Sequence, residues 1–263
     1  DANENGLYDS GEYTDDIYET QDHATIENFT LTDGYVNGSH GGALYTYHVD
    51  LTIDNVDMID NAVEGSNAMG GAIYTRAATL VISNSTFAGN YAGKTGTLGG
   101  GGGAIYAGSS PLYLTKCLFY DNDVVNNWGT AIYHQKTDST HPYLNIDHTT
   151  FHGNSGHAIF NDDNINYANV TLIISNSIVW DGMYTWGSAA YYTYSYTNYS
   201  GSILTGTGNI SSDPNFVDST SDNRDYSLAW PSNSINSAHP NPTGGLDDWT
   251  DDDDDQDPDG TRM

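Results

Sequence analysis

Apolar residues occupy every second position in short stretches that return along the chain at intervals of 28 to 32 residues. Five stretches share the frame apolar-x-apolar-x-polar-small-x-apolar-x-x-Asn/Gly, and a looser copy lies at 24–34. The five are LTIDNVDMIDN at 51–61, LVISNSTFAGN at 80–90, LYLTKCLFYDN at 112–122, LNIDHTTFHGN at 144–154 and LIISNSIVWDG at 172–182. A period of two predicts short β-strands, and the Asn/Gly positions predict turns.

A second phrase alternates with the first. It reads GGALY at 41–45 and GGAIY at 70–74 and 102–106, with weaker copies GTAIY at 129–133, GHAIF at 156–160 and GSAAY at 187–191. Strands that recur this often predict a solenoid whose coils stack strand on strand, about 4.8 Å apart. Each coil then buries its inward side chains against its neighbours.

The stacked phrases predict rows of equivalent side chains along the rod. One inward row is Ile53, Ile82, Leu114, Ile146 and Ile174, and a second is Met58, Phe87, Phe119, Phe151 and Val179. A row of mostly small residues between them is Val56, Ser85, Cys117, Thr149 and Ser177, which makes Cys117 a buried small residue rather than a reactive thiol. The amides of Asn61, Asn90, Asn122 and Asn154 are expected to form a ladder at a turn.

The alternating GGA[IL] and FxxN phrases resemble the repeats of chlamydial polymorphic outer-membrane proteins and of other secreted bacterial right-handed parallel β-helix proteins. SILTGTGNISSDPNFVD at 202–218 resembles the closing segment of such proteins. The expected fold is all-β, a right-handed single-stranded parallel β-helix of about six to seven coils. We expect an acidic N-terminal segment (1–23), the β-helix (24–218) and a closing segment with an acidic tail (219–263).

The charge is strongly negative, with 35 acidic residues against six Lys and Arg and a formal net charge of −29. This balance argues against nucleic acid as a partner, because phosphate binding needs a basic surface. No stretch approaches the 18 apolar residues of a membrane span, so no membrane insertion is expected in this segment. Thirty of the 35 acids are Asp, which favours turns and binds hard cations.

Two acidic stretches have the spacing of a calcium-binding loop. DANENGLYDSGE at 1–12 matches the complete twelve-residue pattern, and DQDPDG at 255–260 matches its first half. The expected calcium ligands are Asp1, Asn3, Asn5, Leu7, Asp9, Glu12, Asp255, Asp257 and Asp259. The alternative for the tail is a solvated acidic run. Calcium is thus the expected cofactor, with a stabilising role.

A weak catalytic alternative lies on the outer face. Lys116 aligns with His148 on the next coil, Tyr113 aligns with Asn145, and Asp147 precedes His148. A Lys or His base, a Tyr acid and an orienting Asp are the parts of a polysaccharide lyase or a related enzyme. Ordinary polar surface is the favoured interpretation, so no catalytic residue is assigned.

The last residue of each GGAIY-like phrase predicts an outward aromatic row. Its members are Tyr45, Tyr74, Tyr106, Tyr133, Phe160 and Tyr191. Stacking along the rod stabilises such a row, and an exposed stripe also offers a contact for sugars or proteins. The resemblance to surface β-helix proteins implies a secreted or cell-surface location, and together with this row it leads us to expect a structural or adhesive role. The expected partners are further copies, other surface proteins or a polysaccharide.

Overall fold

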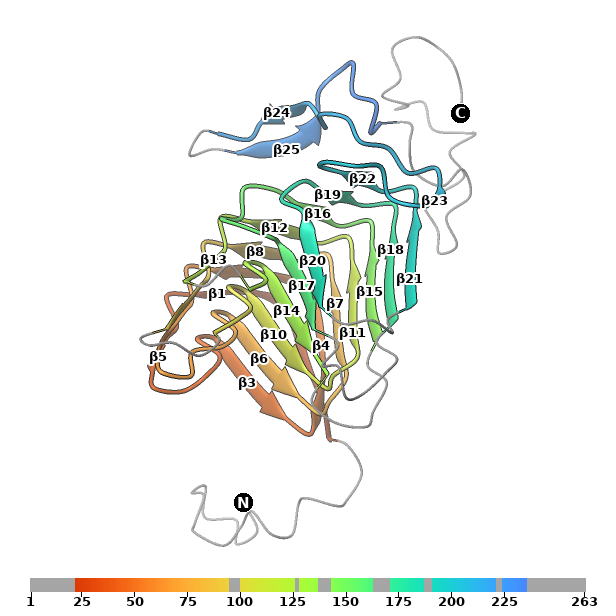
Figure 1. Ribbon diagram of the computed structural model, residues 1–263. Helices are drawn as coiled ribbons and strands as arrows, with labels where there is room; N and C mark the ends of the chain where they lie inside the picture. The colour runs from red at the N-terminus through yellow and green to blue at the C-terminus, as the bar shows by residue number, and fades with distance from the viewer. Residues whose placement is uncertain are drawn as a thin grey trace, which may run out of the picture.

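The computed structural model describes seven stretches of the chain, and the regular elements in them are β-strands (Figure 1). The described residues are 22–94, 100–125, 128–136, 143–162, 171–186, 191–220 and 224–235. All but two of the strands belong to three parallel sheets that wind into one solenoid. The predicted all-β parallel solenoid is therefore confirmed.

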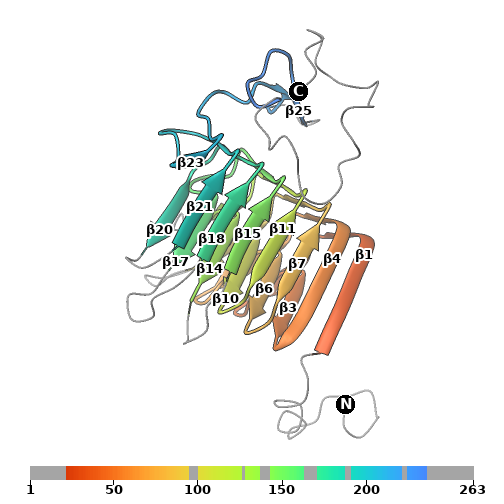
Figure 2. The same cartoon turned by 90° about the vertical axis from the view of Figure 1, so that its right-hand side faces the viewer.

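The largest sheet has thirteen strands and forms two adjoining walls of the solenoid. Its strands are β1 (Asp22–Thr32), β4 (Val49–Ile59), β7 (Leu80–Ser83), β8 (Thr86–Ala88), β11 (Leu112–Thr115), β12 (Leu118–Tyr120), β15 (Tyr143–Asp147), β16 (Thr150–Phe151), β18 (Thr171–Ser175), β19 (Ile178–Val179), β21 (Tyr191–Ser195), β22 (Asn198–Tyr199) and β23 (Gly206–Thr207). Long strands β1 and β4 span both walls, whereas later coils use two short strands joined at a corner (Figure 2).

Two further parallel sheets complete the walls. The second sheet contains β3 (Leu44–Tyr47), β6 (Ile73–Arg76), β10 (Ile105–Gly108), β14 (Ile132–Gln135), β17 (Ile159–Asp162) and β20 (Met183–Trp186). The third sheet contains β2 (Tyr35–Asn37), β5 (Ala62–Gly65), β9 (Tyr91–Lys94) and β13 (Asp123–Val124). The six strands of the second sheet enclose five full turns, slightly fewer than the six to seven coils predicted.

A column of left-handed residues makes the corner between the two walls of the large sheet. Its members have φ between 47° and 61° and are Asn28, Asn55, Asn84, Lys116, His148, Asn176 and Tyr196. Asn adopts this conformation more readily than other residues that carry a Cβ, which explains why Asn is the commonest residue in the column. Lys116, His148 and Tyr196 depart from that preference.

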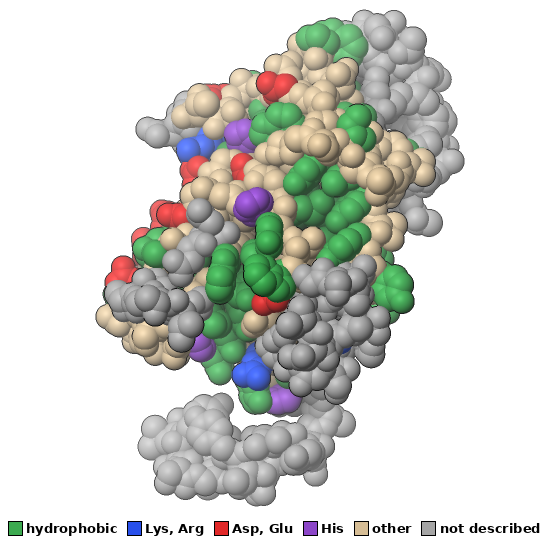
Figure 3. Space-filling view, viewed as in Figure 1, with side chains coloured by type: hydrophobic (Ala, Val, Ile, Leu, Met, Phe, Trp, Pro, Cys, Tyr) green, Lys and Arg blue, Asp and Glu red, His purple; other side chains and the backbone are tan. Residues whose placement is uncertain are grey.

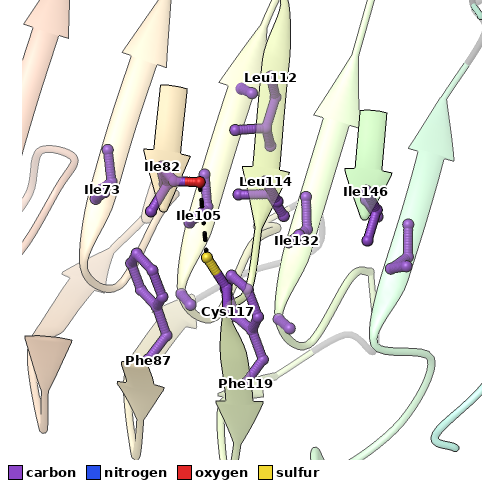
Figure 4. Close-up of a cluster of buried hydrophobic side chains, with 14 of the residues drawn as sticks. Ile73, Ile82, Phe87, Ile105, Leu112, Leu114, Cys117, Phe119, Ile132 and Ile146 are labelled. Carbon is purple, nitrogen blue, oxygen red and sulfur yellow. Dashed lines mark hydrogen bonds between the residues drawn. The ribbon is translucent and has the colours of Figure 1, made fainter. Parts of the chain in front are cut away.

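The predicted inward rows are confirmed. Each member of the row from Ile53 to Ile174 is at most 1% exposed and pairs in register with the next. The row from Met58 to Val179 is fully buried in the same way. Its rings stack, with centroids 4.7 Å apart between Phe87 and Phe119 and 4.8 Å between Phe119 and Phe151. Figure 4 shows these side chains facing the same interior from different walls.

Cys117 is a small buried residue of the core, as predicted. Its thiol lies 3.7 Å from the carbonyl oxygen of Ile82 and 3.4 Å from that of Thr115, both within reach of a weak S–H donor (Figure 4). Burial, opposed by two backbone hydrogen bonds, raises the pKa of the Cys117 thiol to about 11. The thiol is therefore protonated at neutral pH, which is not the state of a reactive cysteine.

The asparagine ladder is also confirmed. The side chains of Asn61, Asn90 and Asn122 each donate a hydrogen bond to the amide oxygen of the next member, at 2.9 to 3.1 Å. The ladder ends on a residue that the sequence did not indicate, because Asn154 donates to Asp181 Oδ2 at 2.7 Å. Each of these hydrogen bonds thus joins two coils and gives buried polar groups the partners that they need.

The GGA phrase owes its two glycines to different constraints. Gly70 has a φ of +65°, which side chains rarely tolerate. Gly71 approaches the next coil so closely that a Cβ would lie 2.0 Å from the carbonyl oxygen of Gly103. The phrase therefore marks the turn at which adjacent coils touch through their backbones.

The last described segment folds back outside the stack. Strands β24 (Phe216–Asp218) and β25 (Asp225–Leu228) form an antiparallel pair (Figure 1), and the Tyr226 ring of β25 lies 5.3 Å from that of Tyr120 in β12. Arg224 pairs with Asp121 at 2.7 Å, and the Tyr226 ring lies 5.5 Å from that of His152. Polar and aromatic contacts thus hold this segment, the described residues of 211–235, against the solenoid. We call it the closing segment.

Candidate functional site

A row of aromatic rings runs along the outer face of the second sheet. In each strand the residue before the ring is an Ile, Leu or Met that packs in the main core, so the alternation turns the ring outward. The register assigns to this row Tyr45, Tyr74, Tyr106, Tyr133, Phe160 and Tyr184. Neighbouring ring centroids are 5.0 to 5.4 Å apart, which makes the row continuous.

The row is not the evenly exposed stripe that the sequence suggested. Tyr74, Tyr106, Tyr133 and Phe160 are only 3 to 6% exposed. These rings cover one another, Met69 packs against them, and the Trp128 ring lies 6.3 Å from Tyr133 and 5.9 Å from Phe160. The four middle rings therefore form a small second core on the outside of the sheet rather than a contact surface.

Tyr191 does not belong to the row, and the prediction that placed it there is wrong. It pairs with Thr171 in the large sheet, while Tyr184 pairs with Phe160 and takes the expected place. The error arose because GSAAY at 187–191 matched the repeat phrase. The signal that locates the true strand is the alternation in MYTW directly after Gly182, in which Met183 contacts the core.

Both ends of the row carry exposed rings. Tyr45 in the first strand is 55% exposed, and a larger group lies at the end nearest the closing segment, on a face where Figure 3 shows hydrophobic side chains at the surface. Trp128, Tyr184 and Trp186 are 41%, 40% and 53% exposed. Ring centroids are 6.3 Å apart between Tyr184 and Trp186 and 5.7 Å apart between Tyr184 and His157. We call Trp128, His157, Phe160, Tyr184 and Trp186 the aromatic cluster. The sequence predicted Phe160 as a member of the row and an enlarged aromatic surface at 180–199, which contains Tyr184 and Trp186, but it did not indicate Trp128, which lies in a turn without periodicity.

Polar side chains lie beside the aromatic cluster. The Tyr133 hydroxyl donates to Asp162 Oδ2 at 2.7 Å, and Gln135 Nε2 donates to the same oxygen at 2.9 Å. Burial and then the adjacent Asp162 carboxylate raise the pKa of Tyr133, so its hydroxyl stays a donor. One carboxylate oxygen of Asp162 is thus fixed next to exposed rings, and its strand neighbour in the next coil is Trp186.

The structure confirms the alignment on which the catalytic alternative depends. The backbone N–H of Lys116 donates to the Asp147 carbonyl at 3.1 Å, and Tyr113 pairs with Asn145. Asp147 Oδ2 lies 2.8 Å from His148 Nδ1. Asp147 and His148 are therefore in direct contact, with exposed Lys116 one coil away at the same corner. Their catalytic roles stay predictions.

The other oxygen of Asp147 holds two coils together. Asp147 Oδ1 accepts hydrogen bonds at 2.8 Å from Ser175 Oγ and from Asn176 Nδ2. Burial is the largest single influence on the Asp147 pKa and raises it, but the bonds from Asn176, Ser175 and His148 outweigh burial and lower the pKa overall. We call such an Asp, with the Ser–Asn pair of the next coil, a corner clasp.

Both predicted calcium loops, at 1–12 and 255–260, lie outside the described residues. Within the described part of the chain no group of three or more His, Cys, Asp or Glu side chains is arranged to hold a metal ion. Calcium binding at the two acidic loops therefore stays a prediction.

A stretch of 82 residues, 31% of the chain, is 34% identical to the Metabotropic glutamate receptor-like protein R of Dictyostelium discoideum. That stretch spans 5% of the relative's own length. No solved structure matches the chain significantly. In the described ranges no helix has the length and apolarity needed to cross a membrane.

A family model described as "Right handed beta helix region" matches residues 17–221, which include the complete stack of coils. The match agrees with the three parallel sheets, the inward rows and the asparagine ladder. The chain belongs to the right-handed β-helix family.

Proposed function

We propose that this chain is a non-catalytic binding module that contacts glycans through its aromatic cluster. The observation that carries this proposal is the convergence of three exposed rings, from Trp128, Tyr184 and Trp186, at one end of a buried aromatic row. Exposed apolar groups gathered in one place are a recurrent mark of a contact surface. The buried row behind them holds the exposed rings in position without a bound partner.

The chemistry of the cluster suits carbohydrate. Aromatic faces pack against the C–H faces of sugar rings, and fixed polar groups bond to sugar hydroxyls. Asp162 and Gln135 provide such groups next to the rings. A folded solenoid wall also presents them on a nearly rigid surface, which limits the entropy lost on binding.

We also propose a secreted or cell-surface location, an adhesive or structural role, and calcium at the acidic ends. Support comes from the resemblance of the GGA[IL] and FxxN phrases to surface β-helix proteins and from the loop spacing at 1–12. Calcium that binds only the folded chain must raise the melting temperature. A chelator at low salt should therefore lower it, and an unchanged melting temperature would refute the calcium proposal.

The glycan proposal is tested by binding of the whole chain to an immobilised glycan array. Tyr184→Ala and Trp186→Ala should each weaken binding about five-fold, as expected for the loss of roughly 1 kcal/mol of aromatic contact. Tyr143→Ala is the matched control, because this tyrosine is 45% exposed but lies in the large sheet. Equal effects of all three substitutions, or binding to no glycan, would contradict the proposal.

A polysaccharide lyase remains the second candidate function, because Asp147 contacts His148 and Lys116 lies beside them. The expected assay is the ultraviolet absorbance of unsaturated products from a panel of uronate polysaccharides. Product that disappears in Lys116→Ala would replace the non-catalytic proposal with this one.

A further inference from the structure

A second column of side chains lies beside the aromatic row on the outer face of the second sheet. The residue two positions after each ring also points outward, because side chains alternate along a strand. The register assigns to this column Tyr47, Arg76, Gly108, Gln135, Asp162 and Trp186. At one end Tyr47 pairs with a cationic residue, and at the other end Trp186 pairs with an anionic one. The two ends therefore favour ligands of different charge.

Two exposed tyrosines lie at the cationic end. Tyr45 and Tyr47 of β3, the terminal strand of the second sheet, are 55% and 49% exposed. The Tyr45 ring stacks on that of Tyr74 with centroids 5.0 Å apart, and the Tyr47 ring meets that of His48 edge-on at 4.1 Å. These contacts hold both rings in place while much of their surface stays open. Such rings can pack against the C–H face of a sugar.

Arg76 places a positive charge next to these tyrosines. Its side chain is exposed, and its register partner is Tyr47, so the two backbones are about 4.8 Å apart. Burial raises the pKa of Tyr74, and the charge of Arg76 opposes that rise, in keeping with a guanidinium that lies near this hydroxyl too. The ion pairs among the described residues involve His148 and Arg224 and not Arg76. The guanidinium therefore offers its donors to a ligand that arrives from solvent.

The guanidinium indicates the charge of that ligand. Its planar group of N–H donors matches a carboxylate, which can accept two parallel hydrogen bonds. The formal net charge of −29 repels a polyanion, but distant acidic groups are screened beyond about 8 Å at physiological salt. A single carboxylate in contact with Arg76 is therefore favoured where a polyanion is not. A sugar with one carboxylate supplies both this anion and a C–H face for the tyrosines.

We propose that Tyr45, Tyr47 and Arg76 form a binding site for a single acidic sugar of an otherwise neutral glycan, with the sugar carboxylate on the Arg76 guanidinium. The site and the aromatic cluster lie at opposite ends of the row, five strand spacings or about 24 Å apart. It does not depend on the function proposed for that cluster. Binding here requires no chemical step.

The test uses the whole chain and matched pairs of methyl glycosides. Each acidic sugar is compared with the neutral sugar that carries CH₂OH in place of its carboxylate, in saturation-transfer NMR titrations at low and at physiological salt. At low salt at least one acidic glycoside should bind about five-fold or more tightly than its neutral counterpart, because it gains charge-assisted hydrogen bonds. This preference should shrink at physiological salt, since ions screen an exposed pair.

Four variants locate the site. Arg76→Gln should remove the preference for the acidic sugar and leave the affinity for the neutral one unchanged. Lys116→Gln is the matched control, because it removes the same charge from an exposed residue of the large sheet and should keep the preference. Tyr47→Ala should weaken both members of a pair, since it removes a surface that both contact. Tyr184→Ala should weaken neither, which distinguishes this site from the aromatic cluster.

Several results would overturn the proposal. One is a panel in which no acidic glycoside binds more tightly than its neutral counterpart. Another is an equal loss of preference in Arg76→Gln and Lys116→Gln, which would show an effect of overall charge rather than a contact. Acetate or an aspartate-containing dipeptide that binds as tightly as the acidic glycoside would show a site for carboxylates in general and not for sugars.

Discussion

Two corner clasps, one in an early coil and one in a late coil, have the same hydrogen bonds. In the first, Asp54 Oδ1 accepts from Ser83 Oγ and Asn84 Nδ2, both at 2.7 Å. In the second, Asp147 Oδ1 accepts in the same way from the Ser–Asn pair of the next coil, both at 2.8 Å. Because the same clasp occurs without any histidine, it is a device for joining coils rather than a mark of catalysis.

The two corners differ in the residue that follows the aspartate. Asn55 donates its side-chain amide to Asn28 Oδ1 at 2.9 Å and so continues the coil-to-coil bonding. His148 instead bonds back to its own neighbour, Asp147. In a repeat protein the common residue of a column explains stacking, so function is best sought where one coil departs from that column.

The largest loss of stability is expected from a substitution in the asparagine ladder. Its side chains also bond from coil to coil, but they are buried, unlike those of the two clasps. Asn122 donates to Phe87 O and Asn154 Oδ1, both at 2.9 Å, and accepts from Asn90. Asn122→Ala leaves several buried groups without partners, so the free energy of unfolding should fall by about 3 kcal/mol. Urea denaturation measures the loss.

The matched control for the ladder is Asn145→Ala, which removes a half-buried amide from the outer face of β15. Its unfolding free energy should change by less than about 0.5 kcal/mol. A ladder variant as stable as this control would show that the buried amides add nothing to the stacking of coils.

Substitutions at the clasps should cause the next largest loss of stability. The loss should be larger at the late clasp than at the early one. The bond from Asn176 to Asp147 is partly buried, whereas the bond from Asn84 to Asp54 is exposed to solvent. Solvent therefore weakens the Asn84–Asp54 bond more than the Asn176–Asp147 bond. We expect Asp147→Ala to lower the free energy of unfolding by about 1 kcal/mol and Asp54→Ala to lower it by less. The reverse order in urea denaturation would contradict this ranking of the two corners.

Acid should weaken both clasps together. Hydrogen bonds from Ser83 and Asn84 lower the pKa of Asp54, and the bonds from Asn176, Ser175 and His148 outweigh burial to lower that of Asp147. A carboxyl group whose folded pKa is lowered stabilises the fold above its unfolded pKa. That stability is lost as pH falls from the ordinary value of 3.8 through the lower folded value.

The measurement is the free energy of unfolding between pH 5 and pH 3 for the wild type and for a double variant, Asp54→Asn with Asp147→Asn. The many other acidic groups contribute equally to both proteins, so only the difference between the two curves reports on the clasps. The wild type should lose more stability below pH 4 than the variant. Parallel curves would mean that neither carboxyl group has a lowered pKa.

The sequence predicted what the repeat requires in every coil. The inward row through Leu114, the second row through Phe119 and the Asn122 ladder all follow from alternation and turn residues, because each coil must satisfy the same packing. The same reasoning failed at Tyr191, where a shorter coil placed Tyr184 in the row instead. Phrase matching detects residues that turns need, but it does not measure the length of a coil.

The contact surfaces were less predictable for a physical reason. Whether Tyr106 is covered and Trp186 is exposed depends on neighbouring turns, which have no period. A hollow of about 170 Å³ that is lined by His148 also needs Leu228 of the closing segment, which lies 80 residues further along the chain. Tertiary contacts of this kind leave no periodic signal in the strands themselves, so only the packing of the closing segment reveals them.

The smallest change in stability is expected in the column of left-handed corner residues, where Lys116→Asn should stabilise the fold. Lys116 has a φ of 55°, a conformation that costs a lysine more than an asparagine. The side chain is exposed, so little packing is lost, and the free energy of unfolding should rise by about 0.5 kcal/mol. Thr115→Asn, in the adjacent extended strand, should give no gain. A loss of stability in Lys116→Asn would show that the lysine side chain makes a stabilising contact that outweighs the cost of its left-handed conformation.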